Sequence, residues 1–307
     1  MDRLSPLAGV SATREVLESH GLVTKHALGQ NFLINDDVLK RIVALADLSP
    51  SDRVLEVGPG IGTLTIALLK SAGRVTSIER DRDLPAVLTE TLSEWSDRFF
   101  LVQKDALDFR LDDLADDGVD LPNKLVANLP YAVAATIVLD FLQRFDFLES
   151  ATVMVQREVA DRMMAAPGTK TYGAYSVKLS LYAQPNGRFP VSPGNFFPPP
   201  HVESAVLRLD RCVAVDEDGS ALSAELLKAT CVMADAAFAN RRKTLANSCK
   251  TYFSGAGGQY PGAVDGLPAI YRHAQIDPKR RGETLDRGEF IRLGKALVEL
   301  SAKHRIR

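Results

Sequence analysis

The sequence predicts an α/β fold with a parallel sheet and a small helical domain at the C-terminal end, and three observations support this fold. Between residue 52 and about residue 156, short runs rich in β-branched residues alternate with longer segments of helical periodicity, the order that βαβ crossovers produce. A glycine-rich segment follows the first of these runs and leads directly into a predicted helix. After Asp210 the strand pattern stops, and a chain of 307 residues is long enough for two domains.

The first domain is expected to hold a sheet of about seven strands. Strands are predicted at residues 54–57, 74–78, 99–102, 124–127, 151–155, 179–184 and 202–209. Helices are predicted at residues 62–71, 82–95 and 132–145 between the strands, and near 12–20 and 36–46 before them. Because the two N-terminal helices would pack on the sheet as a flank or a lid, we assign residues 1–215 to one domain.

The C-terminal part differs in both pattern and charge. Residues 216–220 have the composition of a linker, and helical periodicity over 222–238 and 284–301 predicts a helical domain at about 221–307. Residues 271–307 carry ten Lys and Arg against five acids, whereas the whole chain has a net charge of −2. This asymmetry favours a phosphate backbone as partner of the helical domain, although a solvated amphipathic helix would have the same composition.

Several classes of protein are excluded. The longest apolar run, residues 132–142, is interrupted by Asp140 and is much shorter than the ~18–20 residues of a membrane span. The first six residues have neither the basic nor the apolar part of a secretory signal, so we expect a cytoplasmic protein. Cys212, Cys231 and Cys249 are odd in number and lack C-x-x-C spacing, which argues against a disulfide framework and against a metal site.

The glycine-rich segment indicates a ligand at the end of the first strand. Gly58, Gly60 and Gly62 let the backbone approach a ligand closely, and the helix that follows offers free N–H groups at its N-terminus. The spacing lacks the third glycine of the dinucleotide pattern, and Pro59 removes a donor that a pyrophosphate would use. A dehydrogenase is therefore only a distant alternative.

Acidic residues follow the next two strands. A carboxylate at Glu79 can accept hydrogen bonds from both hydroxyls of a ribose, which serves NAD and S-adenosylmethionine equally. Asp105 offers an acceptor for an exocyclic amine, and Ala106 offers an apolar surface for an adenine ring. Ligands of open α/β sheets bind at the carboxyl ends of the strands, so these residues together predict a nucleoside site.

The residue types after the fourth strand fit methylation of an amine. The side-chain oxygen of Asn128 and the carbonyl of Leu129 or Pro130 can accept both N–H bonds of an adenine N6 amine, which would direct its lone pair at a methyl donor. Tyr131 can stack on the base, and under that role Tyr131→Phe should retain most activity. A simple proline turn that starts the next helix is the structural alternative.

These motifs resemble those of the ribosomal RNA adenine dimethyltransferases and, within that family, of the enzymes that act on the bacterial small subunit. The resemblance covers nearly the whole chain. It rests on residues 28–33 (LGQNFL), 56–60 (EVGPG), 78–81 (IERD), 128–131 (NLPY), 196–204 (FFPPPHVES) and 238–245 (FANRRKTL). It implies a Rossmann-like fold of the class I S-adenosylmethionine-dependent methyltransferases, with S-adenosylmethionine as the cofactor.

The resemblance also implies roles for particular residues. It implies that the cofactor is bound by Asn31, Leu33, Gly58, Glu79, Asp105 and Asn128. It implies that Asn128, Tyr131 and Phe196 hold the target adenine. Phe196 precedes three prolines, and a rigid aromatic side chain there would suit a second stacking surface. The alternative for Phe196 is a hydrophobic plug under the loop.

The implied reaction is dimethylation of N6 on two adjacent adenosines in a loop near the 3′ end of small-subunit (16S) ribosomal RNA. The expected partner is this RNA within a pre-ribosomal 30S particle, approached by a monomeric enzyme during ribosome biogenesis. Arg241, Arg242 and Lys243 form a basic patch that we expect to bind RNA. Two alternatives remain: a large-subunit methyltransferase that confers macrolide resistance, and a non-catalytic RNA-binding factor, against which the intact segment 128–131 argues.

Overall fold

The computed structural model describes residues 3–24, 30–117, 121–255 and 262–305. Met1, Asp2, Leu28 and Gly29, on which part of the sequence argument depends, lie outside these ranges. The chain forms two compact units, the first made of Met1–Ala160 and Pro185–Arg211 and the second of Asp161–Gln184 and Cys212–Arg307. The second unit thus includes a segment, residues 161–184, that we had assigned to the first domain.

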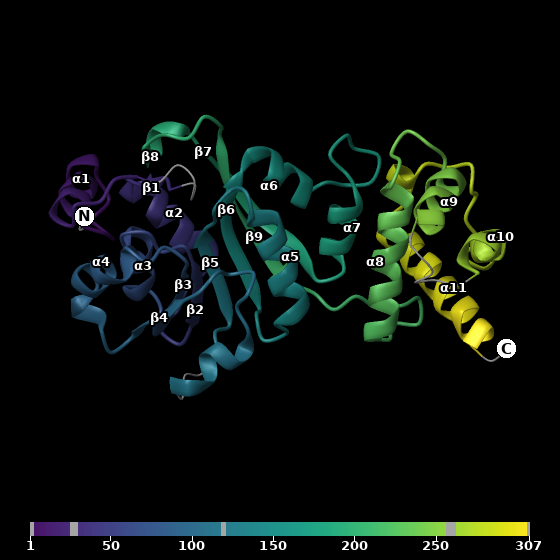
Figure 1. Ribbon diagram of the computed structural model, residues 1–307, viewed down its shortest axis with the longest axis horizontal. Coiled ribbons are helices and arrows are strands. Elements are labelled where there is room, and N and C mark those ends of the chain that lie inside the picture. Colours follow the sequence, from purple (N-terminus) through teal and green to yellow (C-terminus); the bar gives the residue numbers. More distant parts are fainter. Residues whose placement is uncertain (1–2, 25–29, 118–120, 256–261, 306–307) are drawn as a thin grey trace. The chain divides into compact units, whose positions relative to one another are not determined.

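The first unit contains a seven-stranded sheet in the order β4-β3-β2-β5-β6-β9-β7 (Figure 1). The strands are β2 (Arg53–Val57), β3 (Arg74–Glu79), β4 (Phe99–Gln103), β5 (Lys124–Asn128), β6 (Ser150–Gln156), β7 (Ala183–Val191) and β9 (Ser204–Arg211). The pairs from β4 to β6 are parallel, and β9 pairs with β6 in the antiparallel direction. The expected number of strands is confirmed, but the sheet is mixed rather than wholly parallel.

The strand predicted at residues 179–184 is largely wrong. Helix α7 (Ala174–Ser180) extends into the start of that segment, a turn follows at residues 181–182, and β7 begins only at Ala183. The alternating apolar residues Val177, Leu179 and Leu181 are buried, and so short an apolar pattern does not separate a strand from a helical turn. The sequence of β7 contains proline and glycine, which a strand at the sheet edge tolerates.

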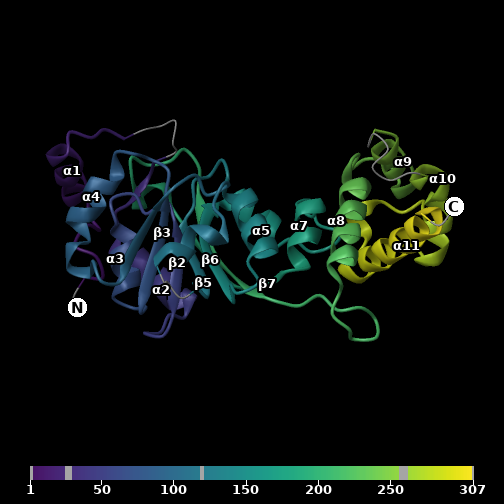
Figure 2. The same ribbon diagram turned by 60° about the horizontal axis from the view of Figure 1, so that its bottom comes forward.

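Helices of the first unit cover the sheet, as Figure 2 shows from a second direction. They are α1 (Val10–Ser19), α2 (Asp36–Ala46), α3 (Thr63–Leu69), α4 (Leu84–Thr91) and α5 (Ala134–Arg144). Helix α2 packs against β6 and β9, and α3 packs against β3. Asn35 begins α2 because its side chain accepts hydrogen bonds from the N–H groups of Asp37 and Val38. A short antiparallel pair, β1 (Phe32–Leu33) and β8 (Phe196–Phe197), completes this unit.

The second unit is helical and has its own core. Its helices are α7, α8 (Ala224–Phe238), α9 (Leu245–Gly255), α10 (Ala263–His273) and α11 (Arg287–Arg305), and α6 (Arg157–Met163) lies at the boundary. The predicted helices at 222–238 and 284–301 are confirmed as α8 and α11, whereas α9 and α10 were not predicted. Gly294 lets α11 approach α8 closely, since a Cβ atom there would lie 2.4 Å from Thr230 Oγ1. All three cysteines are free thiols.

None of the described helices is both long and apolar enough to cross a membrane.

Candidate active site

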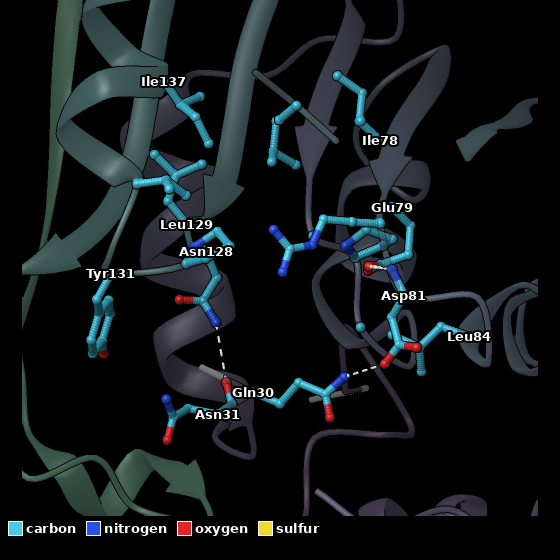
Figure 3. Close-up of a pocket in the computed structure, with 18 of the residues that line it drawn as sticks. Gln30, Asn31, Ile78, Glu79, Asp81, Leu84, Asn128, Leu129, Tyr131 and Ile137 are labelled. Carbon is cyan, nitrogen blue, oxygen red and sulfur yellow. Dashed lines mark hydrogen bonds between the residues drawn. The ribbon is translucent and has the colours of Figure 1, made fainter. Parts of the chain in front are cut away.

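A cavity of about 530 Å³ lies in the first unit, where β2, β3 and β5 end (Figure 3). The strand order reverses between β2 and β5, because the chain runs outward through β3 and β4 and then returns. Such a switch point is where open α/β sheets bind ligands. The cavity is lined by all eight residues that we expected at the cofactor, namely Asn31, Leu33, Gly58, Gly60, Glu79, Asp105, Ala106 and Asn128. Leu129, Pro130 and Tyr131 line it as well.

The loop after β2 can approach a ligand because its glycines have left-handed backbone conformations. Gly58 has a φ of 71° and Gly60 a φ of 60°, values that favour glycine. A Cβ atom at Gly60 would lie 3.1 Å from the ring of Phe32. The N–H of Gly60 also donates a hydrogen bond to the Glu79 carboxylate, so the loop and the end of β3 are tied together.

Glu79 is held in place by backbone donors. Its Oε1 accepts the N–H of Asp81 at 2.7 Å, and the N–H of Arg80 donates to the same carboxylate. Burial raises the pKa of Glu79 above its ordinary value, although the backbone N–H groups act in the opposite direction. The side chain is only 7% exposed and borders the cavity, so it can offer an oriented acceptor to a ribose.

Asp105 is an ionised acceptor near the end of β4. The N–H of Leu107 donates to it at 3.0 Å and lowers the pKa of its carboxyl, and Arg80 lies 3.0 Å from its Oδ2 and lowers the pKa further. Ala106 is buried beside it. This combination fits the predicted contacts with the exocyclic amine and the ring of an adenine.

The Asn128 amide is oriented as the predicted chemistry requires. Its Nδ2 donates a hydrogen bond to the backbone carbonyl of Asn31 at 3.3 Å, which Figure 3 shows as a dashed line. Because the nitrogen is used in this way, the side-chain oxygen remains as an acceptor. Tyr131 extends from the same segment, and its hydroxyl lies 2.5 Å from Ser204 Oγ.

Glu56 has a structural role that its sequence context did not predict. It is 1% exposed, and its Oε2 accepts hydrogen bonds from Thr65 of α3 at 2.8 Å and Ser77 of β3 at 2.7 Å. Burial raises the pKa of this carboxyl to about 7. Glu56 therefore joins β2, α3 and β3 just behind the glycine loop. A charged residue within an apolar strand was the signal that could have revealed it.

Phe196 is buried in the described structure. Its side chain is 2% exposed, belongs to the hydrophobic core of the first unit, and is not among the residues that line the cavity. The reason is the pairing of β8 with β1, which places Phe196 opposite Leu33. This burial is the arrangement expected of a plug under the loop, and contact of Phe196 with the target adenine stays a prediction.

In the basic patch of the second unit, Arg241 differs from Arg242 and Lys243 because it has hydrogen-bond and ion-pair partners within the unit. Arg241 donates hydrogen bonds to the carbonyls of Tyr172 at 2.7 Å and Thr169 at 3.1 Å, and it pairs with Glu283 at 3.0 Å. Arg241 therefore has partners within the unit, although its side chain is still 40% exposed. Arg242 and Lys243 are exposed.

Several cations of the C-terminal tail are also paired. Arg280 contacts Glu289, and Lys295 lies 2.7 Å from Asp216. The side chains of Lys303, Arg305 and Arg307 lie outside the described residues. Because Asp216 lies outside residues 271–307, its pairing with Lys295 lowers the effective positive charge of the tail by one.

Comparison with known proteins identifies the family of this chain. Residues 22–292 match the profile of a family described as Ribosomal RNA adenine dimethylase. The chain belongs to this family. The predicted family and enzyme class are thus confirmed: the chain is an S-adenosylmethionine-dependent adenine dimethyltransferase of ribosomal RNA.

Similar members of the dimethylase family occur in several bacteria. A protein of Corynebacterium diphtheriae named Ribosomal RNA small subunit methyltransferase A is 39% identical over 94% of this chain and 95% of its own length. Proteins of the same name from Bifidobacterium adolescentis and Pelotomaculum thermopropionicum are 38% and 39% identical. The alignments cover 96% of both chains for the former, and 95% of this chain and 98% of its relative for the latter.

Solved structures confirm the predicted fold class. A dimethyladenosine transferase from Plasmodium falciparum has a TM-score of 0.71 at 23% identity, covering 89% of this chain and 98% of that one. The 23S rRNA methyltransferase ErmE has a TM-score of 0.61 at 25% identity, covering 87% of this chain and all of that one. The first unit thus has the class I methyltransferase fold.

Proposed function

We propose that the protein places two methyl groups on N6 of each of two adjacent adenosines, in a loop near the 3′ end of small-subunit (16S) ribosomal RNA. The orientation of Asn128 carries the proposal: its amide nitrogen is bound by the Asn31 carbonyl, so its oxygen is available to accept an amine hydrogen. The choice of the small subunit is supported by the relatives named above, which are similar to this chain over nearly its whole length.

The residues of the cavity fit S-adenosylmethionine. Glu79 would accept the ribose hydroxyls, Asp105 the exocyclic amine of the adenine, and Ala106 would pack against the ring. The left-handed glycines at 58 and 60 leave space for the rest of the molecule next to the loop. When bound, this cofactor supplies an electrophilic methyl group on a sulfonium sulfur.

The remaining residues would act on the target base. An adenine N6 amine is a weak nucleophile because its lone pair is delocalised into the ring. If Asn128 Oδ1 and the carbonyl of Leu129 or Pro130 accept its two hydrogens, the lone pair points toward the methyl donor. Tyr131 would stack on the base and keep it out of its RNA helix. The proton can leave after the transfer, so this scheme needs no strong general base.

The proposed partner is the RNA of a pre-ribosomal 30S particle, in the cytoplasm, where a monomer of this chain would act. The exposed cations Arg242 and Lys243 would contact the phosphate backbone from the second unit. A large-subunit substrate is the second candidate, because the structure is also similar to ErmE. The small-subunit relatives, at 38–39% identity against 25%, favour the first candidate.

The test is methyl transfer from labelled S-adenosylmethionine to purified small and large ribosomal particles that lack these methyl groups. We expect label only on the small subunit, and nuclease digestion with mass spectrometry should find dimethyladenosine at two neighbouring positions. The matched control is Asn128→Ala, which should bind the cofactor but transfer little label. Label confined to the large subunit, or monomethyladenosine as the only product, would refute the proposal.

A further inference from the structure

The hydroxyl of Tyr131 has a partner that comes from a distant part of the chain. Tyr131 follows β5, lines the cavity and is half-buried, and its hydroxyl lies 2.5 Å from the Oγ of Ser204. Either hydroxyl can donate in this hydrogen bond. Stacking alone would not require such a contact, because a phenylalanine ring also stacks on a base. The contact therefore suggests a second requirement on this side chain.

Ser204 is a firmly held anchor. Its side chain is fully buried, and its backbone begins β9, opposite Gln156 at the end of the antiparallel pair with β6. The backbone pairing continues past this point, since the N–H of Arg157 donates to the carbonyl of Glu203 at 2.9 Å. The Arg157 and Glu203 side chains also form an ion pair of 2.6 Å. The position of Ser204 Oγ is thus set by the central sheet rather than by a loop.

The tyrosine oxygen lies at the end of the ring farthest from the backbone, so a hydrogen bond to it restricts rotation of the whole side chain. A ring attached to the loop after β5 would otherwise be free to move between staggered rotamers. Held at Ser204, the ring keeps one direction relative to Asn128, three residues before it in the same segment. The base that stacks on this ring would then present its amine to the Asn128 oxygen at a constant angle.

We propose that Ser204 is a positioning residue for methyl transfer, whose hydroxyl holds the Tyr131 ring where the target adenine stacks. The proposal rests on the proposed function and adds a role for Ser204, the last residue of the segment 196–204. It also changes the expectation for Tyr131→Phe, since that variant loses the anchor although it keeps the stacking ring.

The requirement should be strongest in the second transfer to each adenosine. After one methyl group has been added, the amine has a single hydrogen left, so fewer hydrogen bonds orient it. Stacking on a correctly placed Tyr131 must then do more of the orienting. Loss of the anchor should therefore raise the ratio of monomethyladenosine to dimethyladenosine, an effect that a general loss of folded protein would not produce.

The experiment is a double-mutant cycle of Ser204→Ala and Tyr131→Phe in the full chain, assayed on small-subunit particles. Both single variants and the double variant should lose the same roughly three- to tenfold in kcat/KM for RNA, because each removes the same hydrogen bond. The monomethyl fraction should rise in all three variants, and cofactor affinity should be unchanged. Ser150→Ala is the matched control, since Ser150 is buried at the opposite end of the same strand pair.

Three results would overturn the proposal: full activity in Ser204→Ala, losses that multiply in the double variant, or equal losses of cofactor affinity and thermal stability in Ser204→Ala. If instead the wild-type protein dimethylates no ribosomal adenosine, the proposed function itself fails. The two failures are therefore distinguishable, because the proposal about Ser204 is read only from variants compared with an active wild type.

Discussion

Replacing Glu79 by alanine should weaken binding of S-adenosylmethionine by about 100-fold. A hydrogen bond from a hydroxyl to a carboxylate contributes about 1.5–3 kcal/mol, so two ribose contacts could contribute about twice that. The carboxylate already accepts N–H groups from Asp81, Arg80 and Gly60, which use much of its capacity as an acceptor. We therefore take the lower limit, about 3 kcal/mol, which corresponds to roughly a 100-fold change in Kd.

Isothermal titration calorimetry of the wild type, Glu79→Ala and Glu79→Gln measures this effect. The glutamine variant keeps the size of the side chain but loses its charge, so we expect an intermediate loss of about tenfold. The unfolding free energy should change far less than the affinity, since water in the cavity can satisfy the released N–H groups. Glu94→Ala, on the exposed surface, is the control. Wild-type affinity in Glu79→Ala would refute the assignment of the ribose site.

Three further predictions concern other parts of the molecule. The folded-state pKa of Glu56, about 7, lies above the ordinary 4.5, so the folded protein binds the proton more readily than the unfolded chain. The unfolding free energy should therefore fall as pH rises from about 5 to 7. Urea titrations should show little of this pH dependence in Glu56→Gln. Neutralising Arg242 and Lys243 should lower the slope of log K for RNA binding against log salt concentration by up to ~2, as measured by filter binding. Arg241→Ala should mainly lower the melting temperature, as measured by calorimetry. A changed salt slope in Arg241→Ala together with an unchanged slope in the Arg242 and Lys243 variant would contradict this. Gly60→Ala should lower the melting temperature, because a Cβ atom crowds Phe32 and the φ of 60° is strained for alanine, and it should also weaken cofactor binding, because Gly60 lines the cavity; unchanged calorimetric affinity would contradict this.

Periodicity was enough to predict the sheet, and strand-end residues were enough to predict that the candidate cofactor residues lie together. The alternation of strands and helices over residues 52–156 depends on local patterns, and local patterns are visible in a sequence. Gly58, Glu79 and Asp105 each follow a predicted strand, and the carboxyl ends of parallel strands necessarily meet at one edge. All three residues line one cavity in the structure.

The tertiary structure decided how individual side chains are used, because each use depends on a partner far away in the sequence. Phe196 and Tyr131 were both candidates for stacking, but the pairing of β8 with β1 buries Phe196 in the core, while Tyr131 lines the cavity. Arg241 stands among the basic residues of one segment, yet Glu283 and two distant carbonyls take up its donors. Neither contact leaves a periodic signal, since burial and ion pairing arise only when separate segments pack together.

The same reason applies to the two hydrogen bonds that orient the side chains of segment 128–131. Asn128 could be identified from its residue type and position, but the direction of its amide depends on the carbonyl of Asn31, 97 residues earlier. The anchor of Tyr131 is Ser204, 73 residues later, on a strand that pairs with β6 in the antiparallel direction. The residue types of segment 128–131 were enough to predict a chemistry for it, whereas the packing of the sheet determined how its side chains are held.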